Sequence, residues 1–423
     1  MNVLIVGSGG REHALAWKIS LSNKSPKIYV APGNAGTASV ADNVDLKVND
    51  FNGIANFCRD QAVDLVVVGP EIPLVGGIRN HLQQALPKLL IVGPDQEGAR
   101  LEGSKAWAKD FMERYHIPAA ASKSFHSREL QEANTFLEGL KPPFVIKADG
   151  LAAGKGVLIL ENIEAARDAL EDMLLNKKFG QASNTVVIEE FLEGVELSVF
   201  ILTDGKSYVL LPEAKDYKRI GEKDTGPNTG GMGAVSPVPF ADQDFMQKVE
   251  NEVIKPTISG LQKEKIEYNG FIFFGLINCK GQPKVIEYNV RMGDPEAQVV
   301  LPRIESDLLD LLLATARKEL AQTDLKVTKD AATTVVMVSG GYPDQYRKGL
   351  AIEGLGQNFE SLVFHAGTKF DTSGRVVTDG GRVLALTGLG TDQKQALEKS
   401  YRSALKVCWD EVYYRKDIGN DIL

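Results

Sequence analysis

Short apolar runs alternate with amphipathic stretches along the first hundred residues of the chain. Four runs of mostly β-branched residues cover positions 3–6, 27–31, 64–68 and 89–92, and each ends at a glycine or a proline. Stretches with helical periodicity, such as residues 12–20, lie between these runs. Apolar strands that alternate with helices are typical of a parallel sheet with helices on its faces, so we expect an α/β fold here.

From Ser104 onward the pattern changes to strands joined by glycine-rich turns. Ser104 can cap a helix that ends near residue 115. We expect strands at 144–147, 156–160, 185–190, 196–203, 208–211, 270–278 and 283–289, and helices at 164–176, 242–263 and 306–320. The glycine-rich residues 219–237 form the longest stretch without periodicity, which indicates a functional loop. A third region follows, with strands at 332–338, 362–367 and 382–388 and a helix at 393–407.

The length, charge and cysteine content exclude several classes of protein. A chain of 423 residues corresponds to about three domains. Its 48 basic and 56 acidic residues give a net charge of −8, which argues against non-specific binding to nucleic acid or to a membrane surface. The three cysteines are odd in number and far apart, which argues against a disulfide framework or a zinc knuckle. No apolar run approaches roughly 18–20 residues and the first residues lack a signal-peptide pattern, so we expect a cytoplasmic protein.

A glycine-rich turn follows the first apolar run. Residues 7–12 read Gly-Ser-Gly-Gly-Arg-Glu and open a helix, where glycine lets a ligand approach the backbone and the helix N-terminus favours an anion. Arg11 adds a guanidinium fork that suits phosphate. The nicotinamide fingerprint G-x-G-x-x-G is not met, because Glu12 holds its last position. We therefore expect a phosphate or small-ligand site, with a ligand-free tight turn as the alternative. Glu71 and residues 34–37 follow other strand ends, where open parallel sheets place ligands.

Two lysines accompany a second glycine-rich loop. Lys147 ends one strand, and residues 149–156, with Lys155 among them, connect it to the next. The spacing is too short for a Walker A loop, and Gly156 stands where that motif requires Ser or Thr. Small residues let a polyphosphate lie close to the backbone while the two lysines neutralise its charge. We expect a polyphosphate site here, and an ordinary flexible hairpin is the alternative.

The strand end that follows offers groups for a nucleoside. Residues 188–192 form a strand edge whose backbone N–H and C=O groups suit the rim of an adenine ring. The carboxylate of Glu196 can accept protons from ribose hydroxyls. A surface hairpin with charged ends is the competing interpretation.

Glu287 and Asn289 alternate along one predicted strand, so both oxygens point to the same side and suit one hard cation. Arg291 lies two residues further on and can reach a phosphoryl group in transfer. Beside a polyphosphate loop, this set suggests Mg²⁺-ATP chemistry, and a polar strand exit is the alternative. The neighbouring strand at 271–277 has no acidic residue, so a site with two carboxylates cannot be assembled from these two strands alone.

Another basic and glycine-rich segment lies between these motifs. Residues 215–219 read Lys-Asp-Tyr-Lys-Arg, and residues 224–233 read Asp-Thr-Gly-Pro-Asn-Thr-Gly-Gly-Met-Gly. The basic side chains can hold phosphate or carboxylate, and the glycines expose backbone N–H groups. A mobile solvent loop is the alternative.

Together these segments resemble the phosphoribosylamine–glycine ligase family of the ATP-grasp superfamily. The resemblance runs from residue 1 to 419 and rests on the motifs GSGGREHALAWK, APGNAGT, VGPEIPLVGG, LEGSKAWAKDF, IKADGLAAGKGV, IEEFLEGVELS, DTGPNTGGMGA, VIEYNVRMGDPE, FHAGT, GGRVLALT and RKDIG. It implies a mixture of α/β and α+β folds. We expect a Rossmann-like domain at 1–103, an ATP-grasp domain of two α+β subdomains at 104–325, with 122–195 covering ATP, and a small C-terminal α/β domain at 326–423.

The same resemblance implies the reaction and its participants. ATP, glycine and 5-phosphoribosylamine would give glycinamide ribonucleotide, ADP and phosphate in de novo purine biosynthesis, with Mg²⁺ or Mn²⁺ as the metal. A carboxylate is a poor electrophile, so we expect a glycyl phosphate intermediate and no protein nucleophile. We expect a monomer that binds neither nucleic acid nor membranes. The alternatives are another ATP-grasp carboxylate–amine ligase and a catalytically silent nucleotide-binding regulatory protein.

Individual roles are also implied by the resemblance. The expected catalytic residues are Lys147, Arg291 and Asp294, and the expected metal ligands are Glu287 and Asn289. The expected ATP-binding residues are Lys105, Lys147, Gly150, Gly154, Lys155, Gly156, Glu190, Leu192 and Glu196. The expected residues for glycine and phosphoribosylamine are Gly9, Gly10, Arg11, Glu71, Asp216, Lys218, Arg219, Asn228, Thr229, Gly230 and Gly231. The glycine-rich segments 150–156 and 226–233 are the expected lids, which would protect the acyl phosphate from water.

The chain departs from the family pattern at four positions. Lys215 and Tyr217 stand where the family usually has Gln and His in Q-D-H-K-R. Met292 replaces a usual Phe, and Ala297 replaces a usual Thr or Cys. The Asp and the last Arg of the first motif are retained. We therefore expect activity to be kept, and any effect of these changes to fall on the affinity for glycine or phosphoribosylamine.

Overall fold

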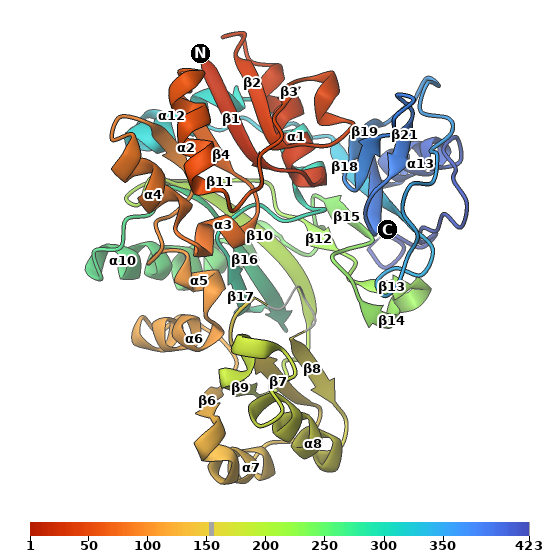
Figure 1. Ribbon diagram of the computed structural model, residues 1–423. Helices are drawn as coiled ribbons and strands as arrows, with labels where there is room; N and C mark the ends of the chain where they lie inside the picture. The colour runs from red at the N-terminus through yellow and green to blue at the C-terminus, as the bar shows by residue number, and fades with distance from the viewer. Residues whose placement is uncertain (152–155, 423) are drawn as a thin grey trace.

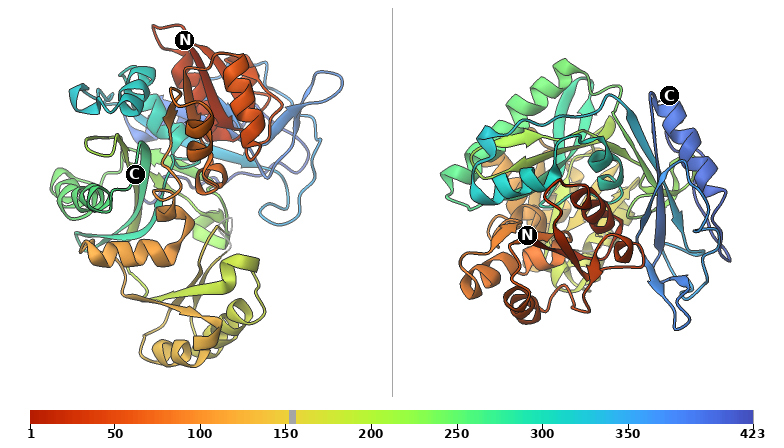
Figure 2. Two further views of the ribbon diagram at one scale, coloured as in Figure 1. Left: turned by 60° about the vertical axis from the view of Figure 1, so that its left-hand side comes forward. Right: turned by 90° about the horizontal axis from the view of Figure 1, so that it is seen from above.

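The computed structural model describes residues 1–151 and 156–422, and three regions are visible in it. Figure 1 shows the N-terminal region at the top, a small lobe formed by residues 122–189 at the bottom, and the C-terminal region to one side. A long antiparallel sheet lies at the centre, between the N-terminal region and the small lobe. The left view in Figure 2 shows the same separation of the small lobe from the rest of the molecule.

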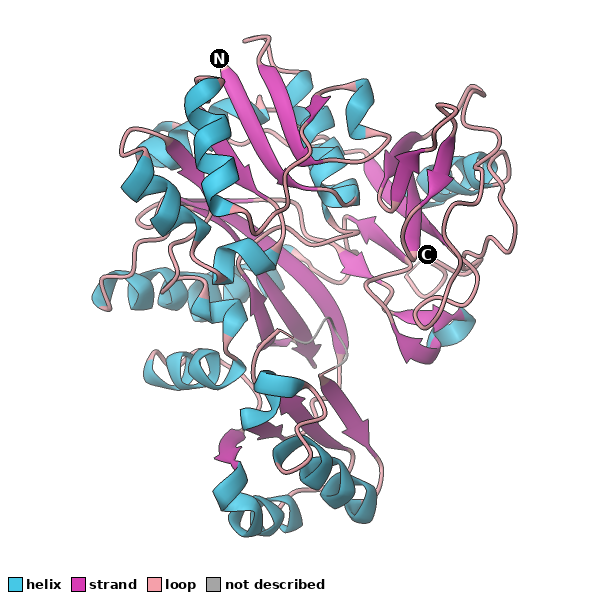
Figure 3. Ribbon diagram, viewed as in Figure 1, coloured by secondary structure: helices cyan, strands magenta, loops and turns pink. Residues whose placement is uncertain are grey.

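The N-terminal region is a five-stranded parallel sheet, which confirms the predicted α/β fold. The strand order is β3-β2-β1-β4-β5. The strands are β1 (Asn2–Gly7), β2 (Lys27–Pro32), β3 (Asp42–Asn43), β4 (Leu65–Val68) and β5 (Leu90–Val92), and the helices are α1 (Gly10–Ser20), α2 (Phe51–Asp60), α3 (Glu71–Val75) and α4 (Ile78–Ala85). Val3 and Ile5 pack in one cluster with α1, whereas Leu4 and Val6 pack in another with α2 and α4. Successive side chains of a strand point to opposite faces, so residues 3–6 of β1 are all apolar because both faces of the strand are covered (Figure 3).

The central sheet is antiparallel, in the order β11-β10-β16-β17. Its strands are β10 (Val195–Thr203), β11 (Tyr208–Leu210), β16 (Gly270–Cys279) and β17 (Gln282–Asn289). The surrounding helices are α5 (Arg100–Gly103), α6 (Lys105–Arg114), α9 (Gln243–Lys248), α10 (Lys255–Lys263), α11 (Ala297–Arg303) and α12 (Leu308–Arg317). The helix expected at 242–263 consists of α9, a π-helical segment (Val249–Ile254) and α10 in succession.

The small lobe has its own sheet and its own core. The sheet order is β6-β9-β7-β8. Its elements are β6 (Ser122–His126), α7 (Leu130–Glu138), β7 (Phe144–Ala148), β8 (Val157–Leu160), α8 (Ile163–Leu174) and β9 (Thr185–Glu189). Phe125, Leu137, Ile146 and Leu170 belong to a cluster that contains residues of this lobe alone. The lobe therefore packs as a unit that is distinct from the central sheet.

The C-terminal sheet takes two of its strands from earlier in the chain. Its order is β12-β15-β18-β22-β19, and α13 (Gln393–Ala404) packs on it. The strands are β12 (Lys215–Asp216), β15 (Gly233–Ser236), β18 (Ala331–Val338), β19 (Leu362–His365) and β22 (Arg382–Gly390). Two small hairpins accompany it, β13 (Arg219–Gly221) with β14 (Thr225–Asn228), and β20 (Thr368–Phe370) with β21 (Val376–Thr378). The short 3₁₀ turns of the chain are Thr37–Ser39, Ser127–Glu129, Gly180–Asn184, Glu222–Asp224 and Leu320–Gln322.

The expectation that residues 219–237 form an irregular loop is wrong. The segment contains β13, β14 and β15, and β15 pairs with β18, about a hundred residues later in the chain. Its glycines and prolines conceal these strands because they interrupt any local alternation of apolar and polar residues. The pairing partner that stabilises β15 is not visible in the local sequence.

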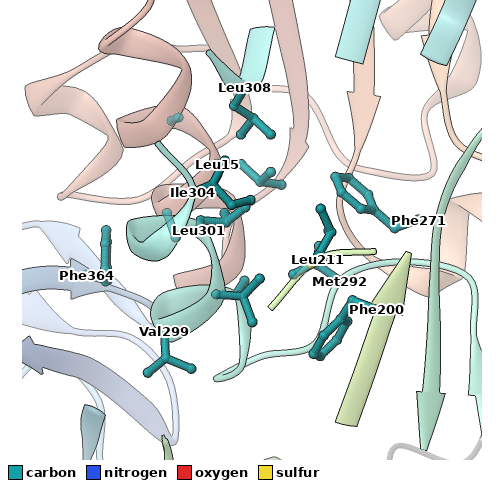
Figure 4. Packing of buried hydrophobic residues seen from close by; sticks show 14 of the residues in the cluster. Leu15, Phe200, Leu211, Phe271, Met292, Val299, Leu301, Ile304, Leu308 and Phe364 are labelled. Atoms are coloured by element: carbon teal, nitrogen blue, oxygen red, sulfur yellow. The ribbon is translucent and has the colours of Figure 1, made fainter. Parts of the chain in front are cut away.

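One hydrophobic cluster joins the N-terminal, central and C-terminal regions. Figure 4 shows Leu15 of α1 beside Leu301 of α11 and Ile304, which follows that helix, with Phe271 and Phe200 of the central sheet close by. The same cluster includes residues of β18 and β19. Close-packed cores have little freedom to slide, so this cluster fixes the three regions relative to one another.

Candidate active site

A cavity of about 190 Å³ lies where the small lobe faces the central sheet. The small lobe contributes charged side chains from β7 and β9, and the opposite wall comes from β17, α3, α5 and α6. The lining residues are Glu71, Leu101, Glu102, Lys105, Ala108, Lys109, Met112, Lys147, Gly150, Leu151, Gly156, Val157, Glu189, Ile286, Glu287, Tyr288, Asn289 and Arg291. Among the expected ATP and metal residues, the structure thus gathers Lys105, Lys147, Glu287 and Asn289 around one space. Gly154 and Lys155 lie outside the described residues.

Lys105 is held at the start of α6 and faces the glycine-rich loop. The Ser104 side chain caps this helix by accepting the Trp107 N–H. Lys105 Nζ donates to the Gly150 carbonyl at 2.9 Å. Burial lowers the pKa of Lys105, although the nearby carboxylate of Glu287 opposes this shift. A buried ammonium with one carbonyl partner is well suited to take an anionic ligand as its second partner.

Lys147 belongs to a buried group of three charges. Its Nζ lies 2.9 Å from Glu189 Oε1, and Lys109 Nζ lies 3.0 Å from Glu189 Oε2. All three side chains are almost fully buried, and burial lowers the pKa of Lys109 despite the opposing charge of Glu189. Sequence reasoning missed Lys109 and Glu189. The four-residue spacing of Lys105 and Lys109, which places both on one face of α6, is the signal that could have indicated Lys109.

The expected nucleoside residues lie at the end of β9 and the start of β10. The Glu190 N–H donates to the Ala121 carbonyl, and the Glu190 side chain accepts the Ala121 N–H at 3.1 Å. Glu190 therefore holds the edge of the lobe in place. Glu196 Oε2 lies 2.5 Å from Lys218 Nζ, so the structure brings an expected ATP residue and an expected substrate residue together.

Glu287 is a half-buried carboxylate at the cavity wall with four cations near it. Burial alone would raise its pKa, but the charges of Lys218, Lys147, Lys105 and Arg291 outweigh burial and lower the pKa below its usual value. Glu287 is therefore ionised at neutral pH. Asn289 lies two residues along β17, and its Oδ1 accepts a hydrogen bond from Arg291 Nη2 at 2.9 Å. Its Nδ2 is buried and has no partner among the described residues.

The donor set of Glu287 and Asn289 fits a hard divalent cation. An ionised carboxylate and a carboxamide oxygen are oxygen ligands of the kind that Mg²⁺ takes. Across residues 1–151 and 156–422, no three His, Cys, Asp or Glu side chains form a group that could hold a metal by themselves. A cation at this position would therefore need further oxygens from its phosphate ligand or from water, as is usual for Mg²⁺ in nucleotide sites.

Arg291 connects β17 to the N-terminal region. Its Nη2 lies 2.9 Å from Glu102 Oε1, and its Nε lies 3.5 Å from Glu71 Oε2. Glu102 also accepts the Val290 N–H at 2.8 Å, so it fixes the backbone beside Arg291. Two carboxylates and Asn289 thus hold the guanidinium at the cavity wall. Sequence reasoning missed Glu102.

The turn after β1 meets the segment after β17. The Arg11 N–H donates to Asp294 Oδ2 at 3.3 Å. A Cβ on Gly9 would lie 3.0 Å from Asp294 Oδ2, and one on Gly10 would lie 2.3 Å from Gln298 Nε2, so a side chain on Gly10 would collide with its neighbour. The Arg11 guanidinium is buried and donates to Glu12 Oε1 at 2.6 Å and to the Met292 carbonyl at 3.1 Å. The structure therefore directs the Arg11 fork toward protein groups that anchor this turn.

Arg382 ties the second glycine-rich loop to the same place. It donates to the Gly230 and Asp294 carbonyls, and its Nη1 lies 3.4 Å from Asp294 Oδ1. Burial would raise the pKa of Asp294, but the charges of Arg382 and Arg11 lower it. Gly231 has a φ of +114°, and a Cβ there would lie 2.4 Å from Pro295 Cδ, so the loop needs glycine at this point. Sequence reasoning gave Arg382 no role, although the motif that contains it was recognised.

Of the eleven residues expected to bind glycine and phosphoribosylamine, all of which the structure describes, only Glu71 lines this cavity. Arg219 and Asn228 pair with each other on the β13–β14 hairpin, and neither lines the cavity. Arg219 donates to the Gly226 carbonyl of its own hairpin at 2.8 Å. Thr229 follows the hairpin and donates through its hydroxyl to the Lys218 carbonyl.

Acidic residues gather around Lys218, which follows β12 and lies next to Glu196 of the central sheet. Lys218 Nζ lies 3.9 Å from Asp216 Oδ1, and the pKa of Asp216 is raised, chiefly by burial. The buried carboxyl of Glu296 accepts the Ser198 hydroxyl at 3.1 Å, and burial together with the charge of Asp216 raises the pKa of Glu296 to about 7. Sequence reasoning missed Glu296.

The raised pKa of Glu296 predicts a pH-dependent stability. Between pH 4.5 and 7 the folded state binds more protons at this site than the unfolded state, so stability falls as pH rises through that window. Glu296→Gln removes this loss. We expect the wild-type chain to lose about 2 to 3 kcal/mol relative to the Gln variant between pH 5 and pH 8. Urea unfolding of both proteins without ligands measures this difference, and parallel pH profiles would contradict it.

Comparison with known proteins covers the whole chain. Family models of phosphoribosylglycinamide synthetase match its N domain at residues 1–102, its ATP-grasp (A) domain at 103–297 and its C domain at 332–421. Phosphoribosylamine–glycine ligase from Vibrio vulnificus (strain YJ016) is 47% identical over 99% of this chain and 98% of its own length. The enzyme of that name from Escherichia coli O157:H7 is 45% identical at the same coverage.

Solved structures show the same architecture. The crystal structure of phosphoribosylamine–glycine ligase from Thermotoga maritima matches 99% of this chain and 100% of its own, with a TM-score of 0.86 and 35% identity. The biotin carboxylase domain of Hydrogenobacter thermophilus 2-oxoglutarate carboxylase, solved with MgADP and bicarbonate, matches 97% of this chain and 91% of its own. Its TM-score is 0.74 at 15% identity, which shows a shared fold. Among the described residues, no helix is long and apolar enough to cross a membrane.

Proposed function

The chain belongs to the phosphoribosylglycinamide synthetase family, and from this membership we propose how its own residues carry out the family's reaction. The protein is an ATP-dependent ligase that joins glycine to 5-phosphoribosylamine and yields glycinamide ribonucleotide, ADP and phosphate in purine biosynthesis. One observation supports our assignment of the site above all others. The cavity between the small lobe and the central sheet is lined by the half-buried anion Glu287 together with Lys147, Lys105 and Arg291.

The reaction proceeds in two steps in this proposal. A carboxylate oxygen of glycine attacks the γ-phosphorus of ATP, the bond to the β-phosphate oxygen breaks, and ADP leaves. The amine nitrogen of phosphoribosylamine then attacks the glycyl carbonyl, phosphate leaves, and the nitrogen loses a proton. Neither step needs a protein nucleophile, so catalysis rests on positioning and on neutralising the charge that moves between oxygens.

ATP occupies the cavity with its phosphates between the two lysine-bearing elements. Lys147 of β7 and Lys105 of α6 neutralise the phosphates, and Gly150 and Gly156 border them. The backbone at Glu190 and Leu192 meets the adenine rim, where the Glu190 carbonyl is the expected acceptor because its N–H is already bonded to Ala121. Glu196 gives up its ion pair with Lys218 and accepts hydrogen bonds from the ribose hydroxyls. Gly154 and Lys155 keep their expected role next to the phosphates.

Glu287 and Asn289 are the proposed ligands of Mg²⁺, with Mn²⁺ as the alternative metal. A cation held there would stabilise the negative charge that develops on the phosphate oxygens of ATP. Asn289 Oδ1 accepts a hydrogen bond from Arg291, and its second lone pair would serve the metal. Arg291 is thereby held beside the metal site, where its guanidinium would face the transferring phosphoryl group.

The two remaining substrates meet where the turn after β1 approaches Asp294. Arg291, Asp294, Asp216 and Lys218, together with the loop 228–231, surround glycine. Gly9, Gly10 and Arg11 border phosphoribosylamine on the other side, and Glu71 begins α3, near Arg291. Arg219 and Asn228 are proposed for the same region, on the β13–β14 hairpin. We also propose a monomer in the cytoplasm, where the three cysteines would remain the free thiols that they are here.

The experiment that tests this function measures ADP release from ATP and Mg²⁺. We expect fast release only when glycine and phosphoribosylamine, generated in situ, are both present, and slow release with glycine alone. Release with a different amino acid or a different amine would favour another carboxylate–amine ligase. Binding of ATP without ADP release, with both substrates present, would favour a silent regulatory protein.

A further inference from the structure

The β13–β14 hairpin cannot hold its position by itself. It consists of three and four residues, its register is irregular, and all four residues of β14 are exposed. A lone two-stranded ribbon is marginally stable at best. Yet the hairpin connects β12, which carries Asp216, to the glycine-rich loop 228–231. Another part of the chain must therefore hold the hairpin in place, and with it the proposed substrate residues at its two ends.

The segment from Tyr413 to Asp421 supplies that support at the outer part of the hairpin. Arg415 is only 1% exposed, its Nη1 lies 2.6 Å from Asp224 Oδ1, and the same nitrogen donates to the Arg219 carbonyl at 3.1 Å. Asp417 accepts the Lys223 N–H at 2.7 Å. The Tyr413 hydroxyl donates to the Ile220 carbonyl at 3.1 Å. The first strand of the hairpin, β13, and the turn that follows it are therefore bonded to this segment.

Asp421 bonds to two residues that directly precede the hairpin. Its two carboxylate oxygens each have one partner, Lys215 Nζ at 2.5 Å and the Tyr217 hydroxyl at 2.6 Å. The Lys215 ammonium also lies 4.0 Å from the centre of the Tyr217 ring, which adds a cation–π contact. Lys215 and Tyr217 are the two positions in this stretch where the chain departs from the family pattern, and both contact the same carboxylate.

The alternation of a β-strand gives these contacts a consequence for the site. Residues 215 and 217 point to one face of the strand, so Asp216 between them points to the other. There Asp216 lies among Lys218, Glu196 and Glu287. The Asp421 carboxylate holds Lys215 and Tyr217 on the face opposite to Asp216. It therefore limits how far Asp216, which lies between them in the chain, can move.

We propose that the segment Arg415–Asp421 is a positioning element for the non-nucleotide substrates, with Asp421 as its central residue. This inference rests on the proposed function, because it assigns Asp216 and the loop 228–231 to glycine. Asp421 touches no reacting atom. It acts through Lys215 and Tyr217 on Asp216, and with Arg415 it holds the hairpin that leads to the loop.

Asp421→Asn tests the proposal, because it removes the charge and keeps the shape of a half-exposed side chain. We expect the KM for glycine to rise about five- to twentyfold and the KM for ATP to change less than twofold. Amide hydrogen exchange in residues 219–228 should accelerate about tenfold or more. Tyr217→Phe, which removes one hydroxyl, should shift both quantities in the same direction by a smaller factor. Asp421→Glu, which keeps the charge, should restore part of the loss.

Asp410→Asn is the matched control. Asp410 is an exposed acid of the same C-terminal region, but its partner is Arg347, away from the hairpin. This variant should keep wild-type KM values and wild-type exchange. Equal rises in both KM values of Asp421→Asn, or unchanged KM for glycine and unchanged exchange, would overturn the proposal. If Asp421→Asn fails to fold, Tyr217→Phe decides by the same criteria.

Two outcomes distinguish a wrong proposed function from a wrong positioning role. If the wild-type chain forms no glycinamide ribonucleotide, the proposed function is wrong, and the exchange measurement still reports whether Asp421 holds the hairpin. If the wild-type chain is active and Asp421→Asn matches it in KM and exchange, only the positioning role is wrong.

Discussion

Replacing Glu287 by glutamine is expected to lower kcat by about two to three orders of magnitude and to leave the fold intact. The half-buried side chain is near Lys218, Lys147, Lys105 and Arg291, whose charges keep it ionised. Glutamine has nearly the same shape but no charge. The variant therefore loses both the anion that neutralises these cations and one proposed oxygen ligand for the metal, and it gains no steric conflict.

The measurement is steady-state ADP formation at saturating glycine and phosphoribosylamine, titrated with Mg²⁺. The Mg²⁺ concentration for half-maximal activity should rise, while thermal unfolding without ligands changes by only a few degrees. Glu267→Gln is a suitable control, because this exposed glutamate pairs with Lys318 and does not line the cavity. Turnover of Glu287→Gln within about fivefold of wild type would remove Glu287 from the metal site.

The parts of the fold that local pattern determines were predictable. Val3 to Val6 are apolar in succession because helices cover both faces of β1, and such a run followed by a glycine-rich turn indicates a parallel strand. The face shared by Glu287 and Asn289 also follows from local pattern, because a strand repeats every two residues. Both inferences depend only on neighbours in the sequence.

The rest depends on contacts between distant residues, which no local period reveals. β15 is stable because it pairs with β18, and its own sequence, Gly-Ala-Val-Ser, gives little sign of a strand. Glu189 and Glu190 are neighbouring residues of the same type, but their partners differ. Glu189 pairs with the two buried lysines, whereas Glu190 holds the edge of the lobe. Arg382 becomes part of the site because the C-terminal sheet brings it to Asp294. The sequence contains these residues but not the distances between them.

Lys147→Met should produce the second large effect, a loss of about 10²-fold or more in kcat/KM for ATP. Methionine keeps the length and the apolar stem of the side chain and removes the ammonium. Lys147 lies 2.9 Å from Glu189, approaches the Ile286 carbonyl at 3.4 Å, and acts through its charge on Glu287. Without this ammonium, the proposed phosphate position has one cation fewer. The missing cation is the one beside the point where negative charge moves from the γ-phosphate to the leaving oxygen.

Lys109→Met is the matched comparison for this variant. Both lysines are almost fully buried and both pair with Glu189, so each variant leaves Glu189 with one remaining partner and costs similar stability. Lys109 lies on the side of Glu189 that faces α6, and its proposed role is to hold Glu189 and thereby Lys147 in place. We expect its loss to lower kcat/KM by less than about tenfold. Similar losses in the two variants would mean that the pair acts as one structural unit. A larger loss for Lys109→Met would mean that Lys109, and not Lys147, contacts the phosphates of ATP. The proposed position of ATP in the cavity would then change accordingly.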